Sequence, residues 1–308
     1  MNILVTGAGG QLGNEIRLAA AGAVDNYIFT DASELDVCRR DEVMEFVACN
    51  AVDVIINCAA YTDVERAEVE PDAADTLNHL AVAYLAEAAS ANNAFLIHIS
   101  TDYVFGGTRQ NTPFTEDAEC MPTGVYGATK LAGEHAIAES GCHYMIFRTS
   151  WLYSAFGNNF LKTMLRLTAE RESLDVVFDQ TGTPTYAADL ALLLCRVVQE
   201  RRFDAEGVYH FSNEGVCSWY DFAVEIARLA GHNNCKITPC RSDAFPSRVR
   251  RPAYSVLDKS KVRSTFGVAV PHWCDSLSRC MEQLRHGGVG DVDFYCKFAG
   301  ANPANNAI

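Results

Sequence analysis

The chain has 308 residues, of which 49% are hydrophobic and 21% are charged, so it is long enough for one large domain or two moderate ones with a buried core. Its formal net charge of -14 repels phosphate polymers and anionic lipid surfaces, which argues against nucleic acid and membranes as partners. No apolar run approaches the roughly 18 residues that a membrane helix needs, and the N-terminus lacks the basic start of a signal peptide. We therefore expect a cytoplasmic protein.

Short runs rich in Val, Ile and Phe alternate with segments of helical spacing along the first half of the chain. The predicted strands lie in NILVT, YIFTD, DVIINCAA, FLIHIST and YMIFRTS, and the predicted helices span 40–51, 72–91, 126–140 and 160–172. This alternation is typical of a parallel sheet that helices cover on both faces. We predict an α/β fold with a doubly wound parallel sheet over residues 1–150.

After about residue 150 the alternation loosens, and prolines and turn residues cluster in DQTGTPT and CRSDAFPSRVRRP. We predict that residues 151–286 form mainly a smaller C-terminal lobe that binds the substrate. The helix and strand expected within 187–213 return to the first sheet in this prediction. Residues 287–308 form a tail whose order the composition leaves open.

Three glycines follow the first predicted strand. Gly7, Gly10 and Gly13 form G-x-x-G-x-x-G before a helix that begins near Gln11. Glycine allows a tight turn, a close approach of the backbone to a pyrophosphate, and close packing of helix on strand. The backbone N–H groups of Gln11 and Leu12 then face the phosphates at the positive end of the helix dipole. We predict a Rossmann-like fold that binds a nicotinamide dinucleotide at this turn.

The second predicted strand ends at Asp31, about 20 residues after the turn, where a carboxylate usually bonds the adenosine ribose. Because this charge repels a 2′-phosphate, we favour NADH over NADPH, although Arg39 and Arg40 keep NADPH open. Asp36 and Val37 are expected to flank the adenine, and an ordinary loop explains these two residues equally well.

The third predicted strand ends in NCAAYTDV. Ala59, Ala60, Tyr61 and Thr62 follow its apolar residues, and small side chains there leave room for the middle of the cofactor. Plain close packing produces the same pattern. We predict that these four residues bind the cofactor.

The next two motifs carry the predicted chemistry. HISTDYVF places Thr101 and Asp102 at the carboxyl end of a strand, where open α/β sheets bind ligands, and VYGATKLAGEHA places Tyr126 and Lys130 on one helix face. A neighbouring ammonium is expected to lower the pKa of a phenol from its usual value near 10. We predict Tyr126 as the proton donor and Lys130 as its modulator, which also bonds the nicotinamide ribose. Thr101 bonds the carbonyl oxygen that hydride attack makes negative.

These motifs resemble those of the extended short-chain dehydrogenase/reductases, and within them the dTDP-4-dehydrorhamnose reductase family. The likeness rests on GAGGQLGNE, STDYVF, VYGATKLAGE, FRTSWLY, GNNF, TMLRL, DQTGTPT and RPAYSVLD, between residue 3 and about residue 258. It implies NAD(P)H-dependent reduction of the 4-keto group of dTDP-4-dehydro-L-rhamnose to dTDP-L-rhamnose. It also implies that Thr101, Asp102 and Trp151 contact the dTDP-sugar, and it is compatible with a homodimer.

Arg248, Arg250 and Arg251 form a basic cluster in an acidic chain. Guanidinium forks bind phosphate oxygens in pairs, so we predict that Arg251 contacts the diphosphate of the sugar nucleotide, with an ordinary surface run as the alternative. Some relatives are said to hold Mg²⁺ between carboxylates where two subunits meet. Glu15 matches one such position and Asp189 matches another only loosely, so we assign no metal site.

Two alternatives stay open. The chain could be another nucleotide-sugar enzyme of this fold, a 4,6-dehydratase or a 4-epimerase, but Tyr103 stands where dehydratases carry a catalytic glutamate. It could also be a non-catalytic dinucleotide-binding regulatory subunit, as one relative is for methionine adenosyltransferase. The presence of Thr101, Tyr126 and Lys130 favours catalysis over a binding role alone.

Overall fold

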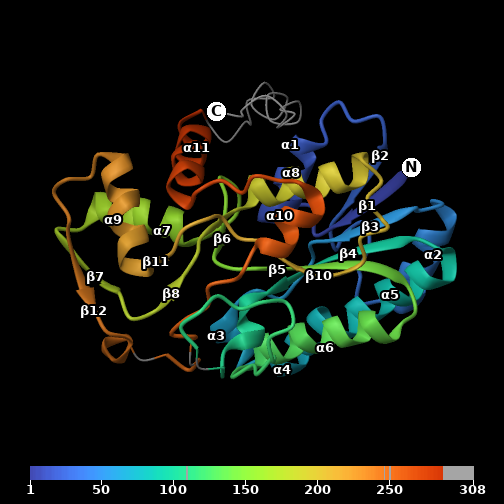
Figure 1. Ribbon diagram of the computed structural model, residues 1–308, viewed down its shortest axis with the longest axis horizontal. Coiled ribbons are helices and arrows are strands. Elements are labelled where there is room, and N and C mark those ends of the chain that lie inside the picture. Colours follow the sequence, from blue (N-terminus) through green and yellow to red (C-terminus); the bar gives the residue numbers. More distant parts are fainter. Residues whose placement is uncertain (109, 246, 250, 287–308) are drawn as a thin grey trace.

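The computed structural model describes residues 1–286 apart from 109, 246 and 250. Within that part of the chain, six parallel strands form the central sheet in the order β10-β5-β4-β3-β1-β2 (Figure 1). The strands are β1 (Asn2–Thr6), β2 (Asn26–Thr30), β3 (Val54–Asn57), β4 (Phe95–Thr101), β5 (His143–Thr149) and β10 (Gly207–His210). The strand order reverses beside β1, and the reversal opens a crevice at the carboxyl ends of β1 and β3.

Helices cover both faces of this sheet (Figure 1). One face carries α1 (Gln11–Ala19), α8 (Ala187–Gln199) and α10 (Ser260–Phe266), and the other carries α2 (Arg40–Cys49), α5 (Ala81–Asn92) and α6 (Val125–Glu139). Strand side chains alternate between the two cores: Ile3 and Val5 pack with α8, and Leu4 packs with α5. The prediction of a doubly wound α/β sheet is confirmed.

Between β3 and α5 the chain forms short helical segments that border the crevice. These are α3 (Val64–Ala67), α4 (Pro71–Asp75) and a π-helical turn, Thr76–Leu80. Asp63 caps α3, because its carboxylate accepts the Arg66 N–H at 3.0 Å.

A second group of elements packs around its own core beside the sheet (Figure 1). It contains three strand pairs, β6 (Leu152–Tyr153) with β9 (Thr185–Tyr186), β7 (Ser173–Val177) with β12 (Lys236–Cys240), and β8 (Thr181–Gly182) with β11 (Cys217–Ser218). Its helices are α7 (Phe160–Glu170), α9 (Trp219–Ala230) and α11 (Trp273–Arg285). Tyr153, Leu161, Phe222 and Leu277 fill the core between them.

The chain passes back to the sheet before completing this second group. Helix α8 packs against α1, and β10 pairs with β5. The boundary near residue 150 stays a prediction, and the predicted tail at 287–308 lies outside the described residues. Among the described helices, none combines the length and the apolar character needed to cross a bilayer.

Candidate active site

The turn after β1 depends on two glycines. Gly7 has φ +63°, and a Cβ on it would lie 2.7 Å from the backbone nitrogen of Ala59, so only glycine fits there. A Cβ on Gly13 would lie 2.5 Å from the Cα of Ala8, which explains how closely α1 packs on the turn. Helix α1 has no side-chain cap and no acidic residue in its first turn. Its N-terminal N–H groups therefore suit an anionic group such as a pyrophosphate.

Asp31 follows β2 directly and faces this turn, because its Oδ1 accepts the Gly9 N–H at 3.0 Å. Arg39 pairs with Asp36 at 3.4 Å, and Arg40 donates to Glu87. Both arginines are thus already engaged by carboxylates. The preference for NADH that Asp31 predicts stays a prediction.

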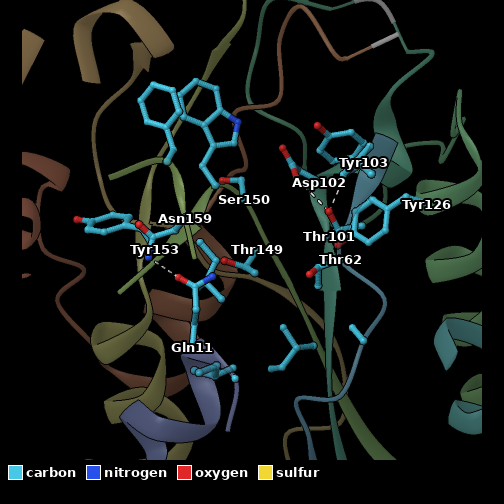
Figure 2. A pocket seen from close by; sticks show the side chains of 18 of the residues that line it. Gln11, Thr62, Thr101, Asp102, Tyr103, Tyr126, Thr149, Ser150, Tyr153 and Asn159 are labelled. Atoms are coloured by element: carbon cyan, nitrogen blue, oxygen red, sulfur yellow. Dashed lines mark hydrogen bonds between the residues drawn. The ribbon is translucent and has the colours of Figure 1, made fainter. Parts of the chain in front are cut away.

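A cavity of about 510 Å³ lies at the carboxyl ends of β1, β3 and β4 and brings most of the predicted site residues together (Figure 2). The predicted residues that line it are Gly7, Gly10, Gln11, Leu12, Ala60, Thr62, Thr101, Asp102, Tyr126, Lys130, Trp151 and Arg251. Those that do not line it are Gly13, Asp31, Asp36, Val37, Ala59 and Tyr61. Val37 is buried in the core beside α2, and the Tyr61 hydroxyl donates to Glu70 at 2.8 Å. Cofactor contacts for these six residues stay predictions.

Thr101 and Asp102 stand where β4 ends. The Thr101 hydroxyl donates to Asp102 Oδ1 at 3.1 Å and accepts the Tyr103 N–H at 3.2 Å, which fixes both side chains (Figure 2). Asp102 is only 2% exposed. Burial raises the pKa of its carboxyl to about 6, against the lowering effect of the Ser255 and Thr101 hydroxyls.

Tyr126 lies in the first turn of α6, whose N-terminus is held by Glu68: Oε1 of Glu68 accepts the Val125 N–H at 2.7 Å. Its ring meets the ring of Tyr103 edge-on, with centroids 5.4 Å apart (Figure 2). Burial raises the pKa of Tyr126 above its ordinary value, and a hydrogen bond with the Thr101 hydroxyl lowers it only in part. The phenol therefore keeps its proton at neutral pH.

Lys130 follows one turn later on α6 and is 1% exposed. Its Nζ donates to the Ile99 carbonyl at 2.6 Å and lies 3.2 Å from His98 Nε2, so the amine faces β4. Burial lowers the pKa of Lys130 to about 8, against the raising effect of Glu134 and Cys58. The prediction that its ammonium lowers the pKa of Tyr126 is wrong in this structure, because burial dominates at the phenol and the amine is directed to the strand.

The opposite wall comes from the segment after β5. Figure 2 shows Thr149, Ser150 and Asn159 across the cavity from Thr101 and Tyr126. Asn159 links this wall to the start of α1, since its Nδ2 donates to Gln11 Oε1 at 2.9 Å while its Oδ1 caps α7. Sequence reasoning assigned no role to Asn159 or Ser150, although both lie in the motifs GNNF and FRTSWLY.

Trp151 stacks on Trp219 with ring centroids 3.6 Å apart and planes 9° apart. Trp151 has φ +47°, a left-handed conformation that an ordinary side chain rarely adopts. Trp219 opens α9 directly after a capping box in which Ser218 and Asp221 bond each other's backbone N–H groups. The sequence analysis did not single out Trp219. The Ser218 and Asp221 pair that marks the start of a helix would have placed Trp219 in its first turn.

Arg251 lines the same cavity and also borders a second cavity of about 890 Å³ between α7, β7 and the segment before residue 254. Its guanidinium lies 3.5 Å from Oε1 of Glu65 on α3. Glu65 also accepts the Arg248 N–H at 3.2 Å. Arg250 lies outside the described residues.

Asp189, one of the two carboxylates considered for a metal, is already surrounded by donors. It accepts from Arg279 at 2.6 Å, Asn213 at 2.7 Å and Ser276 at 2.6 Å. Glu15 is buried in α1. Among the described residues, no group of three or more His, Cys, Asp or Glu side chains is placed to hold a metal ion.

Comparisons with known proteins agree on one family. The model of the RmlD substrate binding domain family matches residues 1–286. The dTDP-4-dehydrorhamnose reductase of Escherichia coli K12 is 40% identical over 296 residues, which cover 92% of this chain and 98% of the relative. The crystal structure of a dTDP-4-dehydrorhamnose reductase from Clostridium acetobutylicum is 42% identical, with a TM-score of 0.88 over 92% of this chain and 100% of that chain.

A third relative was solved with a cofactor. The dTDP-4-dehydrorhamnose reductase of Bacillus anthracis, in complex with NADP, is 37% identical, with a TM-score of 0.87 over 92% of this chain and 99% of that chain. Family model, sequence and structure therefore coincide over nearly all of the described residues, and this chain belongs to the RmlD substrate binding domain family, the family of the dTDP-4-dehydrorhamnose reductases.

Proposed function

We propose that this protein reduces the 4-keto group of dTDP-4-dehydro-L-rhamnose to dTDP-L-rhamnose, using NADH or NADPH. One observation carries the proposal: a single cavity is lined by the glycine turn, by Thr101, Tyr126 and Lys130, and by Arg251. The names of the relatives support the substrate, and the Bacillus anthracis complex with NADP supports the cofactor.

The residues around the turn fit a dinucleotide. The uncapped N-terminus of α1 opens to the cavity through Gly10, Gln11 and Leu12, and Gly7 keeps the backbone there free of side chains. When bound, the reduced dinucleotide supplies the hydride. Lys130 lines the cavity one helical turn after Tyr126 and is proposed to bond the nicotinamide ribose.

Tyr126 is proposed to supply the proton that a ketone needs when hydride adds to its carbon. Hydride addition turns the carbonyl oxygen into an alkoxide, which is a far stronger base than a phenolate. The raised pKa of Tyr126 therefore keeps the O–H in place until that charge develops, without preventing its transfer. The Thr101 hydroxyl, which bonds the phenol, is proposed to turn its single proton from Asp102 to the same oxygen.

The substrate is proposed to lie between the two walls. The indole of Trp151, fixed by its stack on Trp219, borders the sugar, together with Asp102. Arg251 binds the diphosphate, because its long and partly exposed contact with Glu65 is weak enough to be replaced by a doubly charged phosphate pair.

The decisive experiment supplies dTDP-4-dehydro-L-rhamnose and NADH and identifies the product by NMR. Stoichiometric consumption of NADH with formation of dTDP-L-rhamnose supports the reductase. Turnover of a 4-hydroxy dTDP-sugar without net consumption of NADH identifies an epimerase or a dehydratase instead, and tight dinucleotide binding without any turnover identifies a regulatory subunit. Either result contradicts the proposal.

We also propose that the protein is a cytoplasmic homodimer. Light scattering then gives about twice the chain mass of 33.7 kDa, and a mass of one chain contradicts the dimer.

A further inference from the structure

A buried chain of hydrogen bonds runs beneath the cavity from β1 to Lys130. Thr6 Oγ1 lies 2.7 Å from Asn57 Oδ1, Asn57 Nδ2 lies 3.0 Å from His98 Nδ1, and His98 Nε2 lies 3.2 Å from Lys130 Nζ. All four side chains are at most 2% exposed. Each donor and acceptor in this chain must therefore find its hydrogen-bond partner within the protein.

The orientation of the Asn57 amide follows from a backbone donor. The Ala59 N–H points at Asn57 Oδ1 at 3.1 Å, and the Thr6 hydroxyl meets the same oxygen. With the amide reversed, its NH₂ group would face the Ala59 N–H, and two donors would oppose each other. Asn57 therefore presents Nδ2 to the imidazole, and His98 Nδ1 must accept.

The tautomer of His98 then follows. Burial and the nearby Lys130 amine hold the pKa of His98 well below its ordinary value, so the ring is neutral and carries one proton. Because Nδ1 accepts, that proton is on Nε2 and points at Lys130 Nζ. An ammonium has three donors and no acceptor, so it cannot receive this hydrogen bond. A neutral amine accepts it through its lone pair while it donates to the Ile99 carbonyl.

We propose that Asn57 and His98 form a tautomer clamp that stabilises the neutral amine of Lys130 against its ammonium form. Both are positioning residues, because they act through Lys130 and do not line the cavity. The clamp makes Lys130 release its proton to solvent at a lower pH than burial alone would, whereas a permanent cation would keep its charge throughout the pH range. The kinetic consequence rests on the proposed reductase function, and the tautomer does not.

The other titratable groups around Lys130 do not account for the stabilisation of its neutral amine. Glu134, on the same helix as Lys130, forms a salt bridge with Arg148 at 2.7 Å, so the charge of its carboxylate is largely balanced. Cys58, after β3, has a pKa raised by burial and is a neutral thiol. Tyr126 keeps its phenolic proton. The lowering of the pKa of Lys130 to about 8, which burial causes, acts in the same direction as the clamp.

The first test reads the tautomer directly. Long-range ¹H–¹⁵N NMR on histidine-labelled protein at pH 7 is expected to show His98 with a protonated Nε2 and a bare Nδ1, its signals being assigned by their loss in His98→Phe. A proton on Nδ1, or on both nitrogens, overturns the clamp. This measurement needs neither substrate nor cofactor.

The second test reverses the clamp with two substitutions of Asn57. In Asn57→Asp the carboxylate accepts from Nδ1–H, so Nε2 becomes an acceptor for the ammonium of Lys130. Asn57→Leu removes the amide donor and permits the same tautomer without adding a charge. Since a hydrogen bond to a charged group shifts a pKa by about one to two units, the alkaline limb of kcat/KM is expected to move up by that amount in both variants. If the alkaline limb of kcat/KM lies at the same pH in the folded variants as in the wild type, the proposal is contradicted.

Thr6→Val is the matched control, since it removes another hydrogen bond to Asn57 but leaves Ala59 to orient the amide. It is expected to leave the alkaline limb of kcat/KM and the His98 tautomer unchanged. If the limb moves in Thr6→Val by as much as in the Asn57 variants, loosening of the hydrogen-bond network moves it, and the tautomer does not.

If the wild type shows no turnover while His98 carries its proton on Nε2, the reductase proposal fails and the clamp stands. If the enzyme is active while His98 carries its proton on Nδ1, the clamp fails and the reductase proposal stands.

Discussion

The carboxyl of Asp102 is expected to destabilise the folded protein at neutral pH. Burial raises its pKa from 3.8 to about 6, and the side chain is only 2% exposed. The folded state therefore holds the proton at pH values where the unfolded chain has released it. Its contribution to stability is complete below about pH 4 and is lost as the pH rises through about 6, and the difference in pKa corresponds to about 3 kcal/mol.

Asp102→Asn removes this titration while keeping the shape of the side chain. The amide oxygen still accepts from the Thr101 hydroxyl, and the amide nitrogen lies beside the Ser255 hydroxyl. We expect wild type and variant to have similar unfolding free energies at pH 4, and the variant to be about 3 kcal/mol more stable at pH 7 to 8.

Urea unfolding followed by circular dichroism at half-unit steps from pH 4 to pH 8 measures this difference. Asp41→Asn is the control, because the Asp41 side chain is 97% exposed, and its unfolding free energy is expected to change by less than about 1 kcal/mol at every pH. A difference between wild type and Asp102→Asn that stays constant from pH 4 to pH 8 would refute the reasoning, since only a titrating group produces the slope.

Three further predictions concern catalysis and binding. Tyr126→Phe is expected to lower kcat by about 10²- to 10⁴-fold while NADH still binds in fluorescence titration, because the phenol transfers a proton and does not hold the dinucleotide; undiminished turnover would exclude it as the acid. Asp31 predicts that steady-state kinetics show NADH serving at least as well as NADPH, and a large preference for NADPH would contradict that assignment. Arg251→Ala is expected to raise the KM for the dTDP-sugar by roughly 10- to 100-fold through the lost charge-assisted hydrogen bonds, whereas an unchanged KM would remove Arg251 from the substrate site.

Local patterns in the sequence determined the framework of the site. A glycine turn after a strand, polar residues at a strand end and a four-residue spacing on a helix are short-range features, and each has a fixed geometric consequence in a parallel α/β sheet. They were enough to predict that Gly7, Thr101, Tyr126 and Lys130 share one site, and all four line the same cavity.

Only the tertiary structure decided how those groups ionise and which residues face them. The amine of Lys130 is directed to His98, a residue 32 positions away, and Asn159 reaches Gln11 across 148 positions. The sequence alone predicted a lowered pKa for Tyr126, yet burial raises it. The physical reason is that desolvation and hydrogen-bond pairing depend on what packs around a group from every direction, and a one-dimensional pattern specifies only its neighbours along the chain.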